Sequence, residues 1–355
     1  MLKSIGKALL ILLAAILLLV GGLLAYLTLT EYKPIEEELV PIEAVAGKGI
    51  ESGASFKVFS FNIGYGGLGE QSDFFMDGGK EVRPASAEII ETNLQGIESI
   101  LEKNHADFYL LQEVDADSKR SYGIDERARL REGLEVDAAY ALNFSCGYVP
   151  FPLPTIGRVQ SGLYTMSAYS ISQGGASRIA LPNPFSWPLR TANLKRCLLI
   201  TRVPVEGTDK ELVLVNLHLE AYDSGEGKAA QTARLMSFLD VEYNKGNYVV
   251  AGGDFNCGFP VVDSSLWPIV EQGNYVPGVI EEDALPVGFR WAVDPNEATC
   301  RLLNKPLHAP GTNQFYVIDG FIISQNIELL GVETVDEAFV YSDHNPVLLE
   351  ARLLP

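Results

Sequence analysis

The chain has 355 residues, of which 47% are hydrophobic, and a formal net charge of −19. This apolar content excludes an intrinsically disordered protein, and the length allows one large core or two small ones. Residues 1–54 contain four lysines and six glutamates, so they carry −2 and leave −17 for the remainder. Because a body this acidic lacks a basic footprint, tight binding to nucleic acid is not favoured.

The first predicted element is an apolar helix. Residues 8–30 contain no charged side chain. At about 1.5 Å per residue, these 23 residues span the ~30 Å hydrocarbon layer of a bilayer. A cleaved signal peptide has an apolar region of only about 7–15 residues and an A-x-A-like site, and neither feature fits. We therefore expect a transmembrane signal anchor at 8–30, preceded by a short segment at 1–7.

The charges on either side of this helix predict its orientation. Lys3 and Lys7 precede it, and Glu31 and residues 36–38, all glutamates, follow it. The positive-inside rule places the N-terminus in the cytoplasm and the rest of the chain outside. The next segment, 31–54, contains Pro and Gly without periodicity and is predicted to be a linker. A single catalytic domain is then expected at 55–355.

A glycine motif follows the first predicted strand. Residues 56–75 read FKVFSFNIGYGGLGEQSDFF and place Gly64, Gly66 and Gly69 in a G-x-G-x-x-G pattern. In a dinucleotide-binding loop the third glycine opens a helix that holds the pyrophosphate. Here three acids and two more glycines follow within residues 70–79. We interpret the glycines as a flexible loop beside Asn62, the polar residue that ends the strand.

The remaining pattern consists of many short apolar runs and few helices. Helical periodicity is found at 85–103 and 228–243. Strand patterns are found at 57–62, 107–113, 161–171, 194–205, 210–220, 247–256, 314–324 and 345–353. The segments 120–160 and 259–310 are rich in Pro and Gly and are predicted to be long loops. This order indicates an α+β domain with stacked sheets and helices outside.

Polar residues stand at the ends of nearly all these strands. They are Asn62, Glu113, Asn216, His218, Asp254, Asn256, Asp319, Asp343 and His344. Carboxylates and amides without cysteine favour a hard cation such as Mg²⁺ or Mn²⁺. The two histidines add a general base and a group that stabilises a developing oxyanion. The set therefore predicts metal-assisted hydrolysis of a phosphate ester, although a single strand-end Asp or Asn more often forms a turn.

The combination resembles the endonuclease/exonuclease/phosphatase superfamily, the DNase I-like metal-dependent phosphoesterases. The matching segments occur in family order: SFNIG, LLQEV, SGLYTMS, VNLHLE, AGGDFN, VIDGFIIS and YSDHNPV, within residues 56–350. GGDFN followed by SDHNP is the strongest part of the match. The resemblance implies a four-layer α/β/β/α sandwich, two sheets packed face to face with helices outside, preceded here by the single transmembrane helix.

The resemblance also implies roles for individual residues. Glu113 resembles the primary metal ligand, with Asn62 beside it, and Asp343 resembles a further metal-site carboxylate. Asp254 resembles the residue that orients or activates the attacking water. The remaining implied roles are phosphate contacts for Asn256 and His218, and an essential histidine, His344, paired with Asp319. Asn216, as a polar strand-end residue, is a further candidate for substrate binding.

One position departs from the family pattern. An arginine usually follows the strand that resembles SGLYTMS, but Ala168 stands here. The sequence therefore does not identify the basic residue that clamps the phosphate. The candidates are Arg83, Arg158, Lys195 and Arg196. The four cysteines, Cys146, Cys197, Cys257 and Cys300, allow either two disulfides or buried free thiols.

Three functions remain open at this point. We favour a membrane-anchored hydrolase of a phospholipid or small phosphoester, because the acidic body disfavours long polyanions. The first alternative is an extracellular DNase-like endonuclease. The second, of another class, is a membrane-tethered binding module without turnover.

Overall fold

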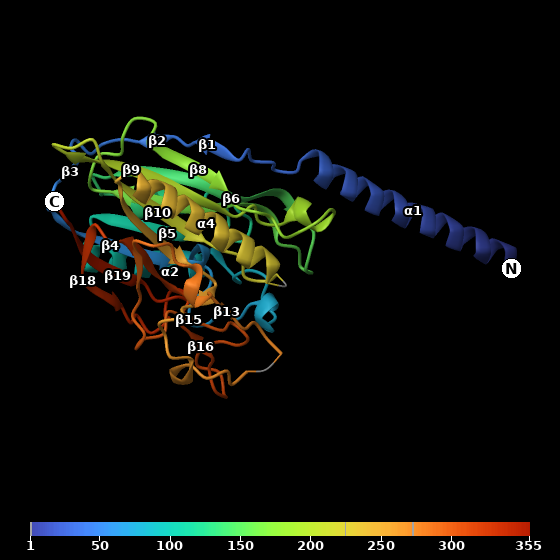
Figure 1. Cartoon of the computed structure of the whole chain (residues 1–355). Coiled ribbons are helices and arrows are strands. Elements are labelled where there is room, and N and C mark those ends of the chain that lie inside the picture. The colour runs from blue at the N-terminus through green and yellow to red at the C-terminus, as the bar shows by residue number, and fades with distance from the viewer. Residues whose placement is uncertain (1, 224, 272) are drawn as a thin grey trace.

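The computed structural model describes residues 2–223, 225–271 and 273–355 (Figure 1). Helix α1, Leu2–Leu29, projects away from the rest of the molecule. Within these residues, its stretch Lys3–Leu29 is the one helix that is long and apolar enough to cross a membrane, and a signal sequence would meet the same criteria. Side chains at positions 3–22 are exposed, whereas Leu27 is buried against the body.

Two large sheets form the body. The first has the order β1-β8-β9-β10-β11-β17-β14, with β3 also paired to β9. Its strands are β1 (Glu37–Leu39), β3 (Ile50–Glu51), β8 (Ala176–Ala180), β9 (Cys197–Glu206), β10 (Glu211–His218), β11 (Tyr248–Asp254), β14 (Phe289–Ala292) and β17 (Asp319–Ser324). The second has the order β18-β19-β4-β5-β7-β6-β2. Its strands are β2 (Ile42–Glu43), β4 (Ser55–Asn62), β5 (Phe108–Asp115), β6 (Asp137–Val149), β7 (Gly157–Ser167), β18 (Ile327–Thr334) and β19 (Val347–Leu353).

Alternation along the strands decides which side chains lie between the sheets. In β4 and β5, Val58 and Leu110 point to the inner core with Phe321 of β17. Their neighbours Phe59 and Leu111 point to the opposite face. Both faces of each central strand are therefore apolar, which requires a cover on each outer side.

Three helices lie outside the sheets. Helix α2, Ala87–Asn104, covers the second sheet with Ile90, Leu94 and Ile97, and α3, Glu126–Arg131, lies beside it. Helix α4, Glu226–Asn244, covers the first sheet with Leu235 and Leu239. The layers are therefore helix, sheet, sheet and helix, and the expected four-layer α+β sandwich is confirmed.

Strand register brings several strand ends to one place. The parallel pair β10 and β11 sets His218 opposite Asp254, and antiparallel β17 starts with Asp319 opposite Asp254. In the other sheet, parallel β4 and β5 set Asn62 opposite Gln112, next to Glu113. Since the carboxyl ends of parallel strands share one edge, both sheets present polar residues at the same end of the sandwich.

The predicted loop at 120–160 is wrong, because it contains α3 and the 13-residue strand β6. Alanines and polar residues hide the strand period there, and pairing with β7 along ten positions holds it. The predicted loop at 259–310 is mostly irregular in its described residues. It contains the 3-10 turns η4 (Ser264–Leu266) and η5 (Glu282–Ala284), and the short strands β12 (Cys257–Gly258), β13 (Gly278–Val279), β14 and β15 (Cys300–Arg301) lie in or beside it. Strand β16 (Phe315–Tyr316) pairs with β15.

The segment 31–54, expected as a linker, runs along the body and adds strands to both sheets. Strand β1 pairs with β8, β2 with β6 and β3 with β9. These two- and three-residue strands occupy sheet edges, where short pairing segments blunt further association. The connection from α1 to the body is therefore made partly of paired backbone.

Candidate active site

Asn62, at the end of β4, lies at the centre of the strand-end cluster. Its Nδ2 donates to Asp254 Oδ2 at 3.1 Å and to Glu113 Oε1 at 3.3 Å, and lies 3.5 Å from His344 Nε2. Its Oδ1 accepts from the backbone N–H of Gly64 at 3.1 Å. One buried amide thus joins residues from β4, β5, β11 and the segment before β19.

Asp254, at the end of β11, is shared by two histidines. Its Oδ2 lies 3.2 Å from His218 Nε2 and 3.8 Å from His344 Nε2. Its Oδ1 accepts from the backbone N–H of Asn256 at 2.8 Å. Burial, together with the nearby carboxylate of Asp319, raises the pKa of Asp254 to about 7.

His344 and Asp319 form the predicted contact. His344 Nδ1 donates to Asp319 Oδ2 at 2.8 Å, and Asp319 is itself held because Thr299 Oγ1 accepts from its backbone N–H at 3.0 Å. Burial acts against a charged imidazole, but the Asp319 carboxylate outweighs it and raises the pKa of His344 well above its ordinary value. The ring therefore favours the imidazolium form, with Nε2 directed toward Asp254.

His218 has the opposite electrostatic setting. Burial, with the positive charges of Arg196 and His344, holds the pKa of His218 well below its ordinary value. Its Nδ1 has no hydrogen-bond partner within the described part of the chain. The two histidines thus differ in protonation, and the neutral one retains an unused ring nitrogen in a buried site.

Two of the predicted residues adopt backbone conformations that are uncommon outside glycine. Glu113 has φ of 54° and Asn256 has φ of 50°. Glu113 lies at a bulge in β5, where the register against β7 shifts between Leu111 and Val114. A bulge redirects the side chain away from the regular alternation, and such strain concentrates at functional sites.

Asp343 completes a group of four carboxylates, whose charge the nearby guanidinium of Arg301 offsets only in part. Burial, with the repulsion of Glu113, raises the pKa of Asp343 to about 7. Glu113, Asp254, Asp319 and Asp343 therefore crowd together beside one imidazolium. An oxygen-rich, negatively charged set of this kind fits a divalent cation that prefers oxygen ligands.

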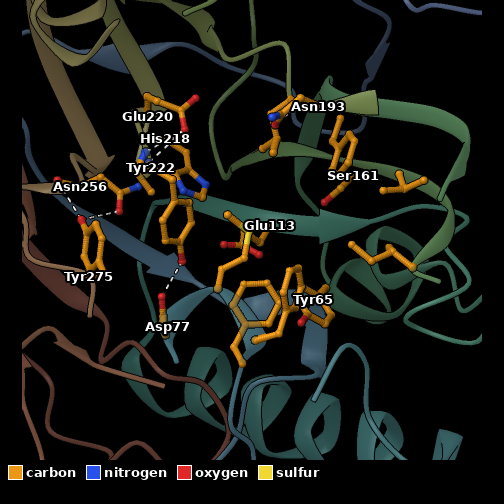
Figure 2. A pocket seen from close by; sticks show the side chains of 18 of the residues that line it. Tyr65, Asp77, Glu113, Ser161, Asn193, His218, Glu220, Tyr222, Asn256 and Tyr275 are labelled. Carbon is orange, nitrogen blue, oxygen red and sulfur yellow. Dashed lines mark hydrogen bonds between the residues drawn. The ribbon is translucent and has the colours of Figure 1, made fainter. Parts of the chain in front are cut away.

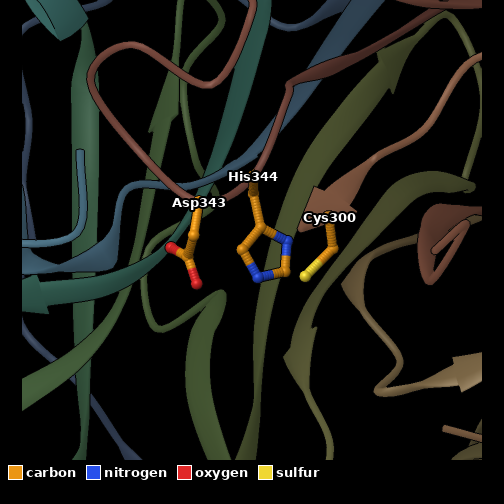
Figure 3. Close-up of side chains that lie close together, drawn as sticks. All are labelled: Cys300, Asp343 and His344. Atoms are coloured by element: carbon orange, nitrogen blue, oxygen red, sulfur yellow. The ribbon is translucent and has the colours of Figure 1, made fainter. Parts of the chain in front are cut away.

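Cys300 stands beside this group, as Figure 3 shows together with Asp343 and His344. The ligand atoms of these three residues lie within 4.8 Å of one another, as do those of Asp254, Asp319 and His344. Burial raises the pKa of the Cys300 thiol to about 12, so the thiol is protonated in the metal-free site. All four cysteines are free and buried, which excludes disulfides in this structure.

Asn216 is the one predicted site residue that lies away from the cluster. Its Oδ1 accepts from Gln112 Nε2 at 2.8 Å, and its Nδ2 donates to the carbonyls of Leu111 and Tyr164 at 3.1 Å each. These bonds join β10 of one sheet to β5 and β7 of the other. Asn216 is fully buried between the sheets, so its position gives it a structural contact and no access to substrate.

A cavity of about 500 Å³ opens onto the cluster (Figure 2). Its polar end includes Glu113, His218, Asp254, Asn256, Asp343 and His344. Among the polar residues there that the sequence did not indicate are Asp77, Tyr222 and Tyr275. Tyr222 donates to Asp77 Oδ1 at 2.7 Å, and Tyr275 donates to Asn256 Oδ1 at 3.0 Å. All three come from predicted loops or turns, where no periodic pattern marks an inward side chain.

Of the four candidate phosphate clamps, Arg196 lines this cavity. It is 5% exposed, and its Nε and Nη1 have no hydrogen-bond partner among the described residues. Its nearest carboxylate oxygen, Glu220 Oε2, lies 3.7 Å away. Arg158 is engaged with Asp117 on the surface. A buried guanidinium with unused donors is suited to an anion.

The glycine loop passes directly beside the cluster. Gly64 and Gly66 form the turn η1, Gly64–Gly66, with φ of 51° and 59°. A Cβ on Gly64 would lie 3.1 Å from Asp343 Oδ1 and 2.9 Å from Leu68 Cβ. The loop therefore serves close approach to the site, and α2 begins only at Ala87, too late for a dinucleotide-binding helix.

The two packed sheets and outer helices form the same fold as solved structures described as endonuclease/exonuclease/phosphatase proteins. This is the DNase I-like sandwich that the resemblance in the sequence implied. No family model matches the chain, and no curated protein matches it.

Solved structures supply the comparison. An endonuclease/exonuclease/phosphatase from Beutenbergia cavernae has a TM-score of 0.57 and 17% identity, over 84% of this chain and 72% of that one. ANGEL2, described as a 2′,3′-cyclic phosphatase, has a TM-score of 0.54 and 17% identity, over 90% and 99%. An endonuclease/exonuclease/phosphatase from Bacteroides vulgatus has a TM-score of 0.51 and 16% identity, over 84% and 99%. At these identities the likeness concerns the fold.

Proposed function

We propose that this protein is a membrane-anchored, divalent-metal-dependent hydrolase of phosphate esters. The observation that carries the proposal is the convergence of Asn62, Glu113, His218, Asp254, Asn256, Asp343 and the His344–Asp319 pair at one end of the two sheets. The phosphoesterase names of the solved structures with this fold agree with it.

Glu113 and Asp343 would hold the metal, with Asn62 beside them. Mg²⁺ or Mn²⁺ would neutralise charge on the phosphate oxygens and on the leaving oxygen. A site that receives a cation would account for both the redirected side chain of Glu113 and the raised pKa of Asp343.

The remaining residues supply the proton and charge chemistry. Asp254 accepts the proton of the attacking water, because its Oδ2 lies at the centre of the site and is not held by an arginine or lysine. His344, kept charged by Asp319, stabilises the negative charge that develops on the phosphate. Asn256 and His218 contact the phosphate oxygens, and Arg196 supplies the clamp that Ala168 cannot.

The experiment is hydrolysis of bis(p-nitrophenyl) phosphate by the full chain in maltoside micelles, with Mg²⁺ and with EDTA. Turnover should require the metal, and Asp254→Asn should lower kcat at least about 10²-fold. His308→Ala is the matched control, because this histidine is 78% exposed at its side chain and lies outside the cavity. Turnover that persists in EDTA, or that survives Asp254→Asn, would contradict the proposal, and absence of any turnover would favour the binding module.

A further inference from the structure

The cavity extends beyond the polar cluster into an apolar part. Its walls there are Leu24, Leu27, Phe144, Phe151, Leu189 and Ala192, which we name the apolar arm. None of these side chains carries a charge or a hydrogen-bonding group. Because a phosphate group needs only the polar end, the apolar arm is available to an apolar part of a ligand.

Two residues of the apolar arm belong to the N-terminal helix. Leu27 packs in a cluster with Phe144, Cys146, Val149 and Val159, with Leu23 against it. Thr28 Oγ1 accepts from Trp187 Nε1 at 3.1 Å, and Glu31 pairs with Arg190 at 3.2 Å. The end of α1 is therefore docked on the body and forms part of the cavity wall.

The length of α1 places this wall at the membrane surface. The charge-free run starts at Ala8. Twenty residues at about 1.5 Å each cover the ~30 Å hydrocarbon layer, which brings the opposite boundary close to Leu27. The apolar arm thus lies at the level of the bilayer where the acyl chains join the headgroups.

The rim of the apolar arm carries exposed apolar side chains. Phe151 is 70% exposed, Leu153 84%, Trp187 51% and Leu189 67%. Trp187 contacts Thr28 of α1, and Val149, two residues before Phe151, packs in one cluster with Leu27. A contiguous exposed apolar patch marks an interaction surface, and a tryptophan is typical of a membrane interface. These segments are positioned to contact the bilayer beside the anchor.

We propose that the substrate is a membrane lipid bearing a phosphate ester, with an acyl chain in the apolar arm and the phosphate at Asp254, His218 and His344. This inference rests on the proposed function and assigns its substrate class. The cavity is continuous from α1 to the catalytic cluster, so a lipid reaches the site without leaving the bilayer entirely. A nucleic acid carries no acyl chain to pack against the aliphatic side chains of the apolar arm, and the acidic body disfavours a long polyanion.

The test is inhibition of bis(p-nitrophenyl) phosphate hydrolysis by butyl, hexyl and octyl phosphate, using the full chain in maltoside micelles. Each buried methylene should tighten binding by up to about fourfold, which is about 0.8 kcal/mol. We expect at least tenfold tighter inhibition by octyl than by butyl phosphate. Ala192→Trp fills the apolar arm and should remove this dependence, whereas Leu17→Trp, on the exposed part of α1, should retain it.

Inhibition independent of chain length in the wild type, or unchanged dependence in Ala192→Trp, would overturn the lipid assignment. Stronger inhibition by a thymidine dinucleotide than by octyl phosphate would also overturn it. If Ala192→Trp loses basal hydrolysis, Phe151→Ser, at the exposed rim, is tested in its place. A chain-length dependence in Phe151→Ser equal to that of the wild type would also overturn the lipid assignment. Failure of the proposed function can be distinguished from failure of the lipid assignment. In that case the wild type would hydrolyse no phosphoester, while calorimetry would still measure how the affinity for alkyl phosphates depends on chain length.

Discussion

His344 depends on a neighbour for its charge. Its Nδ1 and Asp319 Oδ2 are 2.8 Å apart, both side chains are buried, and the carboxylate holds the imidazolium in place. In a site with few exposed groups, one such contact determines both the orientation and the protonation of the ring. The pair should therefore act as one unit.

The first prediction follows from this pairing. His344→Ala and Asp319→Ala should each lower kcat at least about 10²-fold, and the double variant should lose little more than either single one. The measurement is a double-mutant cycle on bis(p-nitrophenyl) phosphate hydrolysis, with His308→Ala as control. Losses that add as independent factors would show that the two residues do not cooperate.

Glu113 also acts through a single side chain, because its strained backbone directs the carboxylate into the site. Glu113→Gln keeps the size and the hydrogen-bond acceptor but removes the charge. We expect a sharply raised Mg²⁺ concentration for half-maximal turnover, with Tm near that of the wild type. Metal dependence equal to that of the wild type would assign the ligand role elsewhere.

At the scale of elements, α4 is attached to the first sheet by one buried acid near its end. Glu242 accepts from Arg202 of β9 at 2.8 and 2.9 Å, from Lys245 at 2.7 Å and from Asn247 at 2.9 Å. Burial alone would raise the pKa of Glu242, but these donors outweigh it and lower that pKa to about 2. The contact joins a helix to a strand through charge, in addition to the apolar packing of α4.

This pKa gives the third prediction. The folded-state pKa of Glu242 lies below its ordinary value of 4.5. The ionised Glu242 therefore contributes fully to the stability of the fold above about pH 4.5, and this contribution is lost as pH falls toward 2. It amounts to about 3 kcal/mol at most.

Glu242→Gln should lower the free energy of unfolding at pH 6 and flatten its dependence on pH between 5 and 2. Asp240→Asn, exposed on the same helix, is the matched control and should follow the wild type. The measurement is urea unfolding at several pH values. A pH dependence as steep in Glu242→Gln as in the wild type would contradict the prediction.

At the scale of the whole molecule, helix α1 is held against the body in a fixed position. The last turns of α1 pack on the body, and the edge strands of residues 37–51 hold the connecting segment to both sheets. The strand-end cluster, the cavity and the last turns of α1 therefore have a defined mutual placement. A freely swinging tether would not give the cavity a wall made of its own residues.

The fourth prediction concerns topology. Lys3 and Lys7 precede the apolar run and glutamates follow it, so the body should lie outside the cytoplasmic membrane. Protease added to intact cells, after removal of any outer barrier, should degrade the body and leave a short membrane fragment. Protection of the body until the membrane is lysed would reverse the orientation, and a body released without its first 30 residues would indicate a cleaved signal sequence.

Much of this architecture was predictable because its signals are local. Apolar runs at β4, β5, β10 and β11 read as strands, and the acids, amides and histidines after them stand out against those runs. The motifs GGDFN and SDHNP added the family resemblance, and with it the sandwich. Strand β6 was missed because alanines and polar residues weaken its alternation, and its stability comes from backbone pairing with the following strand β7, which leaves no mark on the side-chain pattern of β6.

The amino-acid sequence by itself therefore determined the apolar helix and the sandwich, and it singled out most of the polar residues that the structure brings together at the strand ends. Tertiary structure alone decided that Asn216 is enclosed between the sheets, that Arg196 faces the cavity with unused donors, and that Leu24 and Leu27 form part of its wall. The physical reason is that burial and cavity shape arise from contacts between segments far apart in the chain. A side chain's neighbours along the sequence do not specify which distant element will cover it.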